Sequence, residues 1–292
     1  MAHKIHVIIN PASGQPQPIL HTLNSVFHPL GIDWDVFITK QSGDAERLAR
    51  QAAAAGVDVV AAYGGDGTVM EAARGLFGSL TPLAILPGGT ANLMSVELGI
   101  PKNLAQAAAI AANPESQVRL VDAGLFNGKS HFLLRVGLGY AAKRVEGADR
   151  ELKDRYGILA YSIAGLRALT QSNQAHYSIN VDGQEHQLQG FSCLIDNAGN
   201  LGMRGAGLKS IRVDDGLLDV IVIRDLRIRT FIELGVVLED SEPDPDHILH
   251  LHGRQIHIET DPPQPVQIDG EVAGESPVSI QVVPGILRIL TL

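Results

Sequence analysis

A glycine-rich turn lies between a predicted strand and a predicted helix in the first quarter of the chain. The buried-strand pattern of residues 57–62 leads into Tyr63, Gly64, Gly65, Asp66, Gly67 and Thr68, and Val69 continues into a helix-forming segment. Glycine lets the backbone approach an anion closely, and the free N–H groups of a helix's first turn point at it. Because Asp66 would repel a bare phosphate, a divalent cation or its bound water is expected between them. The turn therefore predicts a phosphate site that works with a cation.

Strand and helix patterns alternate over the first 125 residues. Apolar runs predict strands at residues 4–9, 34–39, 57–62, 83–86 and 118–121, and helical patterns fill residues 18–29, 44–55, 68–77, 90–98 and 104–112. Such alternation is typical of a doubly wound parallel sheet with helices on both faces. Ligands of these sheets bind at the carboxyl ends of the strands. Because Asn10, Thr39, Gly64 and Pro87 fall at such ends, four loops are expected at one edge.

The pattern changes to short strands after about residue 125. Asn127-Gly128 and Asp182-Gly183 predict two-residue hairpin turns between apolar runs. Strand-like runs recur at residues 132–136, 176–181, 191–196, 217–223, 255–259, 266–268 and 278–282, and one helix is predicted at 153–170. We therefore expect a nucleotide-binding α/β domain over residues 1–125 and a largely antiparallel β domain over residues 126–283.

Composition limits the classes to which the chain can belong. At 292 residues, two domains are expected rather than one. The net charge of −9 argues against a broad nucleic-acid surface, and a single cysteine, Cys193, excludes an internal disulfide framework. No apolar stretch approaches the ~18 residues that span a bilayer, and the strand pattern of residues 5–9 leaves no room for a signal peptide. We expect a cytoplasmic protein.

Two further turns are of the same kind as the first. Pro87-Gly88-Gly89-Thr90-Ala91-Asn92 leads from a strand into a helix, and Asn10-Pro11-Ala12-Ser13-Gly14 ends the first strand. Together the three turns predict a functional site at the edge of the sheet. The segment 124–130 looks like a phosphate loop, but it has three residues between its glycines where that motif needs four. Its Asn127-Gly128 predicts a hairpin instead.

In order and spacing, these motifs resemble the diacylglycerol kinase catalytic-domain family, which includes bacterial lipid kinases and sphingosine and ceramide kinases. In the first domain the resemblance rests on Asn-Pro-x-Ser-Gly at 10–14, Thr39 with Gly-Asp-Ala at 43–45, Gly-Gly-Asp-Gly-Thr-x-x-Glu at 64–71 and Gly-Thr-Ala-Asn at 89–92. In the second it rests on residues 136–140, on 214–219, on Asp269-Gly270-Glu271 and on the last strand at 283–288. The resemblance therefore covers nearly the whole chain.

The resemblance implies a phosphofructokinase- or NAD-kinase-like α/β domain and a C-terminal β-sandwich domain for the lipid, with the strand at about 284–292 returning to the first domain. It also implies ATP and Mg²⁺ as cofactors. Nucleotide contacts are then expected from Thr39, from Tyr63 to Val69, from Gly89 and Thr90, and from Asn10 and Ser13. Asp66 would organise magnesium through water. A structural magnesium is expected near Asp215, on the backbone carbonyls of Arg212 and Leu217.

Glu271 is the expected general base. A lipid hydroxyl is a poor nucleophile near neutral pH, and a positioned carboxylate that accepts its proton is worth roughly 10²–10⁴ in rate. Asp269-Gly270-Glu271 follows an alternating strand, where a turn can place a carboxylate in a cleft. The resemblance implies the same role for Glu271. Asp219, by contrast, is expected to be a structural partner rather than a metal ligand.

Three positions depart from the family's usual pattern. Arg135 stands where an asparagine is common, residues 209–211 replace a Pro-x-Ala segment, and Leu93-Met94 follows Asn92 where Asp-Phe is common. These changes bear on the acceptor and on the magnesium dependence. They leave Asp66, Thr90 and Glu271 in place.

We therefore expect an ATP-dependent kinase that phosphorylates a lipid hydroxyl of diacylglycerol, phosphatidylglycerol or sphingoid type. The expected partner is lipid at the membrane surface, met by peripheral contact, with a second copy of the chain as a candidate homodimer partner and no nucleic acid. An NAD kinase shares Gly-Gly-Asp-Gly-Thr, but the segments at 10–14, 89–92 and 269–271 argue against it. The third interpretation is a catalytically silent nucleotide- or lipid-binding regulator.

Two other groups of residues have weaker functional interpretations. The histidines between His247 and His257 could hold a metal, although a solvated strand face is the favoured interpretation. The basic residues between Lys143 and Arg155 could touch an anionic membrane, but acidic neighbours largely cancel their charge.

Overall fold

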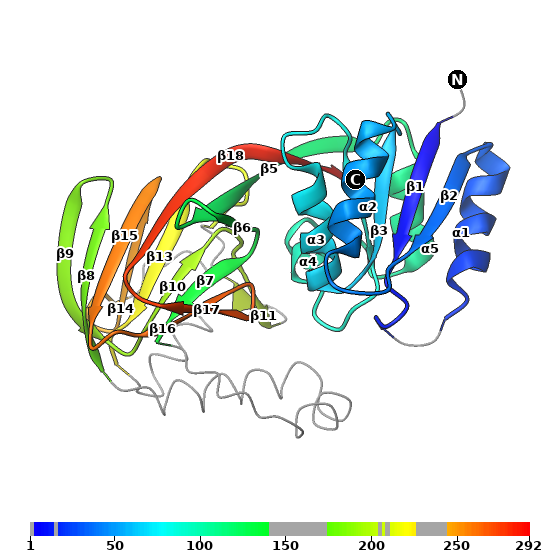
Figure 1. The fold of residues 1–292 in the computed structure, drawn as a ribbon. Coiled ribbons are helices and arrows are strands. Elements are labelled where there is room, and N and C mark those ends of the chain that lie inside the picture. Colours follow the sequence, from blue (N-terminus) through cyan, green and yellow to red (C-terminus); the bar gives the residue numbers. More distant parts are fainter. Residues whose placement is uncertain (1–2, 15–16, 140–173, 204–205, 208–210, 226–243) are drawn as a thin grey trace. The chain divides into compact units, whose positions relative to one another are not determined.

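The computed structural model describes residues 3–14, 17–139, 174–203, 206–207, 211–225 and 244–292 (Figure 1). The chain divides into two units. Unit 1 comprises Met1–Asp122 together with Gly285–Leu292, and unit 2 comprises Ala123–Pro284. The last strand, β18 (Val278–Thr291), contributes residues to both units.

Unit 1 is built on a parallel sheet. Its strands are β1 (Lys4–Ile9), β2 (Asp33–Ile38), β3 (Val59–Gly64), β4 (Leu83–Pro87) and the end of β18, in the order β2-β1-β3-β4-β18. Every neighbouring pair in this order is parallel, and Ile289 of β18 lies opposite Leu83 of β4. All residues of β3 and β4 are buried, as expected for central strands that are covered on both faces.

Helices connect these strands and cover the sheet. They are α1 (Ile19–Phe27), the 3₁₀ turn η1 (His28–Leu30), α2 (Asp44–Ala54), α3 (Asp66–Leu76), α4 (Leu93–Glu97) and α5 (Leu104–Ala112). The helix α1 packs against α5, and α2 packs against α3. The apolar residues Leu23 and Phe27 of α1 are fully buried, which fixes the face that this helix turns to the core.

The order of the strands locates a switch point in unit 1. The chain passes from β1 to its neighbour β2, and then returns past β1 to β3 on the other side. Right-handed crossovers therefore put α1 and α2 on opposite faces of the sheet. In open sheets of this kind, the loops at the carboxyl ends of the two strands that flank the reversal form the ligand crevice. Here these strands are β1 and β3.

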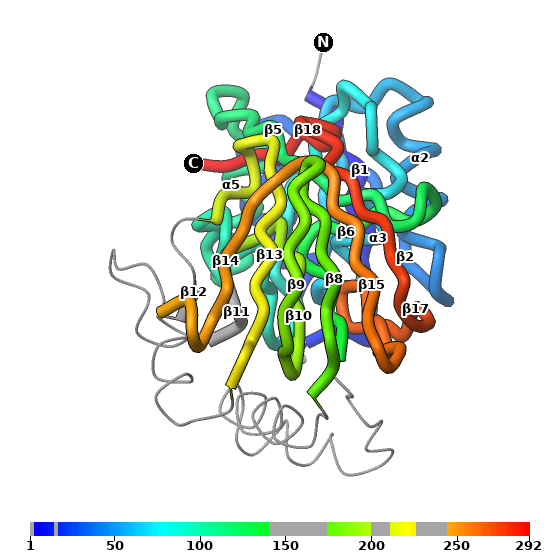
Figure 2. Tube along the Cα trace, turned by 90° about the vertical axis from the view of Figure 1, so that its left-hand side faces the viewer, coloured from blue at the N-terminus to red at the C-terminus, as the bar shows by residue number. Residues whose placement is uncertain are grey.

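Unit 2 consists mainly of two antiparallel sheets. One contains β9 (Gln184–Gly190), β8 (Ala175–Val181), β15 (Gln255–Asp261) and the start of β18. Attached to it are β6 (Ser130–Phe132) and β5 (Gln117–Phe126), whose residues up to Asp122 belong to unit 1. The other has the order β14 (Ile248–Gly253), β13 (Leu218–Ile223), β10 (Ser192–Asp196), β7 (Arg135–Leu138), β16 (Pro265–Ile268) and β17 (Glu271–Glu275). Figure 2 shows β9, β8 and β15 beside one another. A short pair, β11 (Asn200–Met203) and β12 (Ala206–Gly207), completes the described strands.

The two sheets of unit 2 share one hydrophobic core. Side chains from β8 and β15, such as Tyr177 and Ile258, join side chains from β7, β10 and β13, such as Val136 and Val220. Alternate residues of β15 are buried and exposed, as in a sandwich whose sheets each have one wet face. Sandwich packing in unit 2 and the doubly wound sheet in unit 1 confirm the predicted fold class.

Several element boundaries differ from those expected. The strand predicted at 132–136 is two strands, because the chain breaks its pairing between Phe132 and Arg135. The helix predicted at 90–98 begins only at Leu93, since Asn92 has a left-handed backbone with φ of 50°. The strand at 57–62 is shifted to Val59–Gly64, and β9 and β17 were not predicted.

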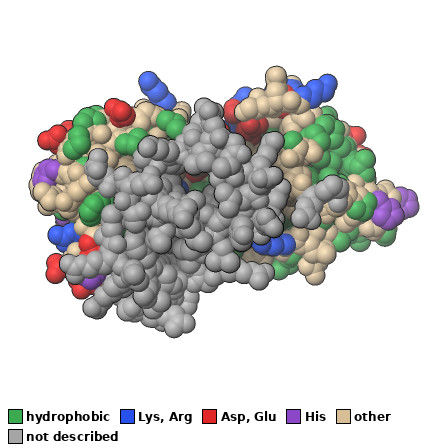
Figure 3. Space-filling model, turned by 90° about the horizontal axis from the view of Figure 1, so that it is seen from below, with side chains coloured by type: hydrophobic (Ala, Val, Ile, Leu, Met, Phe, Trp, Pro, Cys, Tyr) green, Lys and Arg blue, Asp and Glu red, His purple; other side chains and the backbone are tan. Residues whose placement is uncertain are grey.

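Two expected features lie outside the described residues. The helix at 153–170 and the basic segment at 143–155 fall in the part that the structure leaves undescribed. None of the described helices is long and apolar enough to cross a membrane. On the described part of the face in Figure 3, acidic and basic side chains are scattered among hydrophobic and other ones.

Gly75 is predicted to set the distance between α2 and α3. A Cβ atom on Gly75 would lie 2.3 Å from the carbonyl oxygen of Glu46 and 2.9 Å from the Cβ of Ala49. Alanine gains up to ~1 kcal/mol in helix propensity. A backbone oxygen cannot rotate away, however, and overpacking costs about 1–3 kcal/mol. Gly75→Ala should therefore lower the free energy of unfolding, measured by urea denaturation.

The matched control is Gly67→Ala in the same helix. Gly67 is exposed, and a Cβ there would have no other atom within 4 Å. The free energy of unfolding should stay unchanged or rise by up to about 1 kcal/mol. Equal effects of the two substitutions would contradict this account of the α2–α3 contact.

Candidate active site

The three glycine turns of unit 1 meet backbone to backbone at the carboxyl ends of β1, β3 and β4. A Cβ atom on Gly14 would lie 2.0 Å from the carbonyl oxygen of Gly88, and one on Gly89 would lie 2.5 Å from the Cα of Gly65. Gly88 packs on the ring of Tyr63, and a Cβ atom on Gly88 would lie 2.8 Å from the Cζ of that ring. Since no side chain fits at these contacts, the loops present closely spaced backbone to whatever binds there.

Asn10 ties the first turn to the second. Its side-chain amide donates to Thr68 Oγ1 at 2.9 Å, its backbone N–H donates to the Tyr63 carbonyl at 3.0 Å, and its Oδ1 accepts from the Ala12 N–H at 3.0 Å. Ser13 closes the turn through its N–H, which donates to the Asn10 carbonyl. The sequence predicted Asn10 as a nucleotide contact, and its contacts here show that it holds the loops together at the switch point.

The predicted nucleotide residues differ in exposure. Gly67 and Thr90 are exposed, and Gly65, Asp66 and Gly89 are half-buried, so these five can be reached from solvent. Asn10, Ser13 and Thr39 are half-buried as well, whereas Tyr63, Gly64, Thr68 and Val69 are buried. Thr68 packs directly against Gly64, where a Cβ would lie 2.4 Å from the Thr68 Cβ. Tyr63 accepts a hydrogen bond from the side chain of Gln17 at 2.6 Å. Tyr63, Gly64 and Thr68 therefore stabilise the loop from its buried side.

Asp66 is the first residue of α3, and its carboxylate reaches the start of α4. Its Oδ1 accepts the Leu93 N–H at 2.6 Å. Burial raises the pKa of the Asp66 carboxyl above its usual value, while backbone N–H groups of Leu93, Met94 and Asn92 oppose the shift. A cation close to Asp66 would favour the charged form further. The carboxylate therefore has a structural contact that sequence reasoning missed.

Asn92 holds the third turn closed. Its Oδ1 accepts the Gly89 N–H at 2.9 Å, and its amide donates to the Gly89 carbonyl at 2.7 Å. This reciprocal pair fixes the segment between β4 and α4, and the left-handed backbone of Asn92 starts the helix. Asparagine adopts that conformation more readily than most residues, which is the signal in the sequence that could have revealed the helix start.

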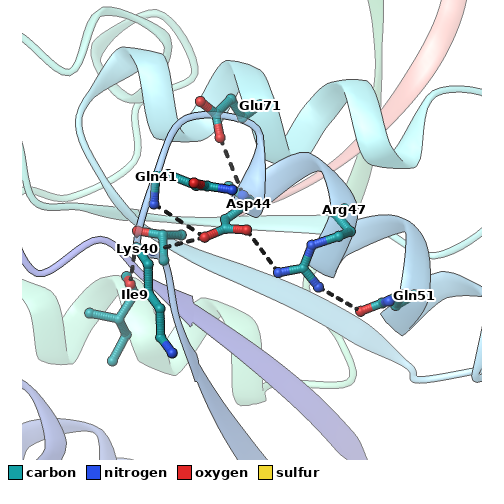
Figure 4. Close-up of polar contacts among 9 residues, drawn as sticks. Ile9, Lys40, Gln41, Asp44, Arg47, Gln51 and Glu71 are labelled. Carbon is teal, nitrogen blue, oxygen red and sulfur yellow. Dashed lines mark hydrogen bonds and ion pairs between the residues drawn. The ribbon is translucent and has the colours of Figure 1, made fainter.

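The loop after β2 is held by two carboxylates, as Figure 4 shows. Asp44 accepts N–H groups of Lys40 at 2.9 Å and Gln41 at 3.2 Å and pairs with Arg47 at 2.8 Å. The Arg47 side chain and the Lys40 N–H hold the pKa of Asp44 below its usual value. Glu71 on α3 accepts the Ala45 N–H at 3.2 Å and thereby caps α2 from another helix.

Thr39 lies at the start of this loop. Its N–H donates to the Ile9 carbonyl at 3.0 Å, which places the residue beside the end of β1. Glu71 also accepts from the Ser42 hydroxyl at 3.0 Å, so the loop is connected to the helix that begins at Asp66. The structure thus brings the loop that carries Thr39 to the same sheet edge as the glycine turns.

In unit 2, Glu271 follows a tight turn at the edge of a sheet. Asp269 and Gly270 have positive φ values of 47° and 91°, and Ile268 pairs with Glu271 across the turn. All residues of β17, including Glu271, are exposed. The Asp269 carboxylate accepts backbone N–H groups from residues far away in the sequence. The turn therefore presents Glu271 to solvent and anchors it through Asp269.

The segment predicted to bind a structural metal is an exposed turn before β13. Asp215 Oδ1 accepts the Leu217 N–H at 3.0 Å, and Gly216 has φ of 74°. Arg212 pairs with Asp214 at 3.2 Å. One carboxylate and nearby backbone carbonyls are hard oxygen donors of the kind that Mg²⁺ takes. The donor set fits the expected ion.

The clustered histidines do not form a metal site in the described part of the chain. Among the described residues, no group of three or more histidine, cysteine, aspartate or glutamate side chains could hold a metal ion. His250 instead pairs with Asp219 at 2.6 Å, and His257 contacts Ser279 at 2.9 Å. Asp219 is thus a structural partner on the sheet.

Replacing Asp66 by asparagine is predicted to change stability with pH. The pKa of Asp66 is raised in the fold, so its ionisation opposes folding, and this cost grows as pH rises through the folded pKa. Asp66→Asn keeps the oxygen that accepts from Leu93 and removes the charge. Its stability relative to the parent protein should be greater at about pH 8 than at about pH 4, measured by urea denaturation. A difference that grows toward low pH would contradict the burial of the charged carboxylate.

Comparison with protein families gives two matches along the chain. Residues 4–125 match the family described as the diacylglycerol kinase catalytic domain. Residues 135–291 match the family described as the YegS C-terminal NAD kinase beta sandwich-like domain. The first match contains the glycine turns, and the second contains Glu271 and Asp215.

Similar proteins are found among bacteria. A protein of Synechocystis sp. named as uncharacterized is 31% identical over 97% of this chain and 69% of its own length. A Staphylococcus haemolyticus protein named "Putative lipid kinase" is 30% identical over 84% of this chain and 80% of its own. A crystal structure of a diacylglycerol kinase from Bacillus anthracis superposes with a TM-score of 0.81 at 29% identity, covering 99% of this chain and 97% of that one. The family matches, the relatives and the shared fold together show that this chain belongs to the diacylglycerol kinase family.

Proposed function

We propose that the protein is an ATP-dependent lipid kinase, which transfers the γ-phosphoryl group of ATP to a hydroxyl of a lipid of diacylglycerol, phosphatidylglycerol or sphingoid type. Family membership supports the reaction class, and the relatives named above are described as lipid or diacylglycerol kinases. In the reaction, a bond forms between the lipid oxygen and the γ-phosphorus, the bond to ADP breaks, and the lipid hydroxyl loses its proton.

The observation that carries the proposal is the side-chain-free contact among the glycine turns at the switch point. A Cβ atom on Gly14 would collide with Gly88, and a Cβ atom on Gly89 would collide with Gly65. Backbone N–H groups at such turns, together with the start of α3, are suited to bind the phosphates of a nucleotide. We assign phosphate binding to the exposed part of these turns, around Gly67 and Thr90.

Magnesium is part of the proposal because phosphoryl transfer depends on neutralising phosphate charge. We assign Asp66 to the water shell of that ion, since its half-buried carboxylate lies in the glycine turn. The ion would neutralise charge on the phosphates. The backbone N–H groups of the turns would hold the phosphates in position before transfer, and Asp66 would hold the hydrated ion beside them.

We assign proton removal to Glu271. It is an exposed carboxylate on a turn with a defined backbone conformation, and a positioned carboxylate is a group that can take a proton from a hydroxyl. The proposed acceptor is an apolar lipid with a primary or secondary hydroxyl. Such a substrate is offered at a membrane surface, so contact with the membrane would be peripheral.

Glu271→Gln is predicted to remove most of the activity. Loss of the base should lower kcat for lipid phosphorylation by about 10²–10⁴. The Michaelis constant for ATP should change little, because glutamine keeps the shape of the side chain. Transfer of radiolabelled γ-phosphate would be measured with diacylglycerol, phosphatidylglycerol, sphingosine, ceramide and NAD offered in parallel.

Glu275→Gln is the matched control, because Glu275 is an exposed carboxylate at the other end of β17. Its kcat should stay within about twofold of the parent value. Label in NAD alone would identify an NAD kinase and reject the proposal. ATP binding without label in any acceptor would identify a silent binder of nucleotide.

Asp215 is predicted to bind a stabilising magnesium ion. Asp215→Asn keeps the oxygen that accepts from Leu217 but removes the negative charge. Magnesium should raise the melting temperature of the parent protein, and about tenfold more magnesium should be needed for the same rise in the variant. Asp214→Asn, which loses the pair with Arg212 instead, should keep the response to magnesium. An equal response in all three proteins would reject the assignment.

A further inference from the structure

The backbone at the break between β6 and β7 is hydrogen-bonded to the side chains and backbone N–H groups of two distant residues, Asp269 and Asn197. Leu133 and Leu134 form the break and Arg135 is the first residue of β7, and all six backbone polar groups of these three residues are paired. Asp269 accepts the three N–H groups, at 3.2, 3.1 and 2.9 Å in chain order, and donates its own N–H to the Arg135 carbonyl at 3.0 Å. Asn197 donates its side-chain amide to the Leu133 carbonyl and its backbone N–H to the Leu134 carbonyl, each at 2.9 Å.

This arrangement explains why an apolar stretch does not continue as one strand. Backbone groups that would have paired with a neighbouring strand are used by the side chain of Asp269 and by Asn197 instead. Three successive N–H groups around one carboxylate form an anion-binding concavity, and charge-assisted hydrogen bonds of this kind are about twice as strong as neutral ones. Arg135 adds an ion pair with the fully buried Asp196 at 3.1 Å.

Asp269 is also the first residue of the turn that presents Glu271. The strand after the turn is exposed along its whole length, and among the described strands its one neighbour is β16. Edge strands with few buried contacts open readily. The Asp269 carboxylate therefore supplies a strong connection between this turn and the interior of unit 2.

We propose that Asp269 is a positioning residue for Glu271: it fixes the turn, and hence the carboxylate that accepts the lipid proton, to the break between β6 and β7. This inference rests on the proposed function, since it assigns a task to Glu271. Asp269 itself exchanges no proton with the substrate. A loosened turn would leave nucleotide binding intact and reduce the time that Glu271 spends in the productive position.

The chain contains a matched control for this turn. Asp182 is also the first residue of an Asp-Gly hairpin, with φ values of 50° and 89° along the turn. Its carboxylate accepts the N–H groups of Arg254 and Gln255, at 3.0 and 2.8 Å, and its own N–H donates to the Gln255 carbonyl at 2.9 Å. The residue that follows this turn is Gln184, which cannot serve as a base. Asp182 is exposed and Asp269 is half-buried, so the two substitutions can differ in their effect on folding. The free energy of unfolding of each variant is therefore measured separately from its kcat.

The test compares Asp269→Asn with Asp182→Asn in the full-length protein. Asparagine tolerates a positive φ, so both turns can keep their conformation, but one accepting oxygen becomes a donor that faces an N–H group. Asp269→Asn should lower kcat for lipid phosphorylation by about 10- to 100-fold and leave the Michaelis constant for ATP within about twofold. Asp182→Asn should change neither beyond about twofold. Equal kcat values in the two variants would overturn the proposal.

The double variant Asp269→Asn with Glu271→Gln decides whether Asp269 acts through Glu271. If it does, adding Asp269→Asn to Glu271→Gln should cost less than about a further twofold in kcat, because the group being positioned is already lost. A further loss as large as that in the parent protein would overturn the proposal.

Hydrogen exchange provides a measurement that does not need activity. In Asp269→Asn, the amides of residues 133–135 and 271–275 should exchange faster than in the parent protein, whereas Asp182→Asn should affect residues 254–255 instead. Unchanged exchange at 133–135 and 271–275 would overturn the positioning role. A parent protein that phosphorylates no lipid would reject the proposed function, and exchange alone would then decide whether Asp269 holds the turn.

Discussion

The candidate site depends on backbone-to-backbone contact between loops that have no side chains to separate them. Gly14 touches Gly88, and Gly65 touches Gly89, so three turns from three different strands share one small volume. Their polar side chains then act as ties: Asn10 links the first turn to Thr68, Asp66 reaches the start of α4, and Asn92 closes the third turn. The three turns are therefore held in fixed positions relative to one another at this edge of the sheet.

Local chemistry made part of this architecture predictable from the sequence. Alternating strand and helix patterns gave the doubly wound sheet, and Asn127-Gly128 and Asp182-Gly183 form hairpin turns with positive φ at both positions. The glycine turns fall at strand ends as expected. These features are encoded within a few neighbouring residues, so a local pattern suffices to find them.

Features that depend on distant partners could not be found in this way. The break between β6 and β7 exists because Asp269, more than 130 residues away, competes for the backbone groups of Leu133–Arg135. The cap that Glu71 provides for α2 and the contact of Asp66 with Leu93 likewise join separate elements. Their sequence motifs predicted binding or catalysis, whereas the structure shows that the same side chains also hold the backbone. A sequence motif therefore predicts the position of a site better than it predicts the role of each residue in the site.

The strand β18 has a consequence for the order in which the chain can fold. Its first residues pair with β15 in unit 2, and its last residues pair with β4 in unit 1. The sheet of unit 1 thus lacks one of its five parallel strands until residues 285–291 have left the ribosome, although its other four strands are made within the first ninety residues. Domains of a growing chain generally fold as units, starting from the N-terminus. Here unit 1 can complete its sheet only after residues 123–284 of unit 2 have been synthesised.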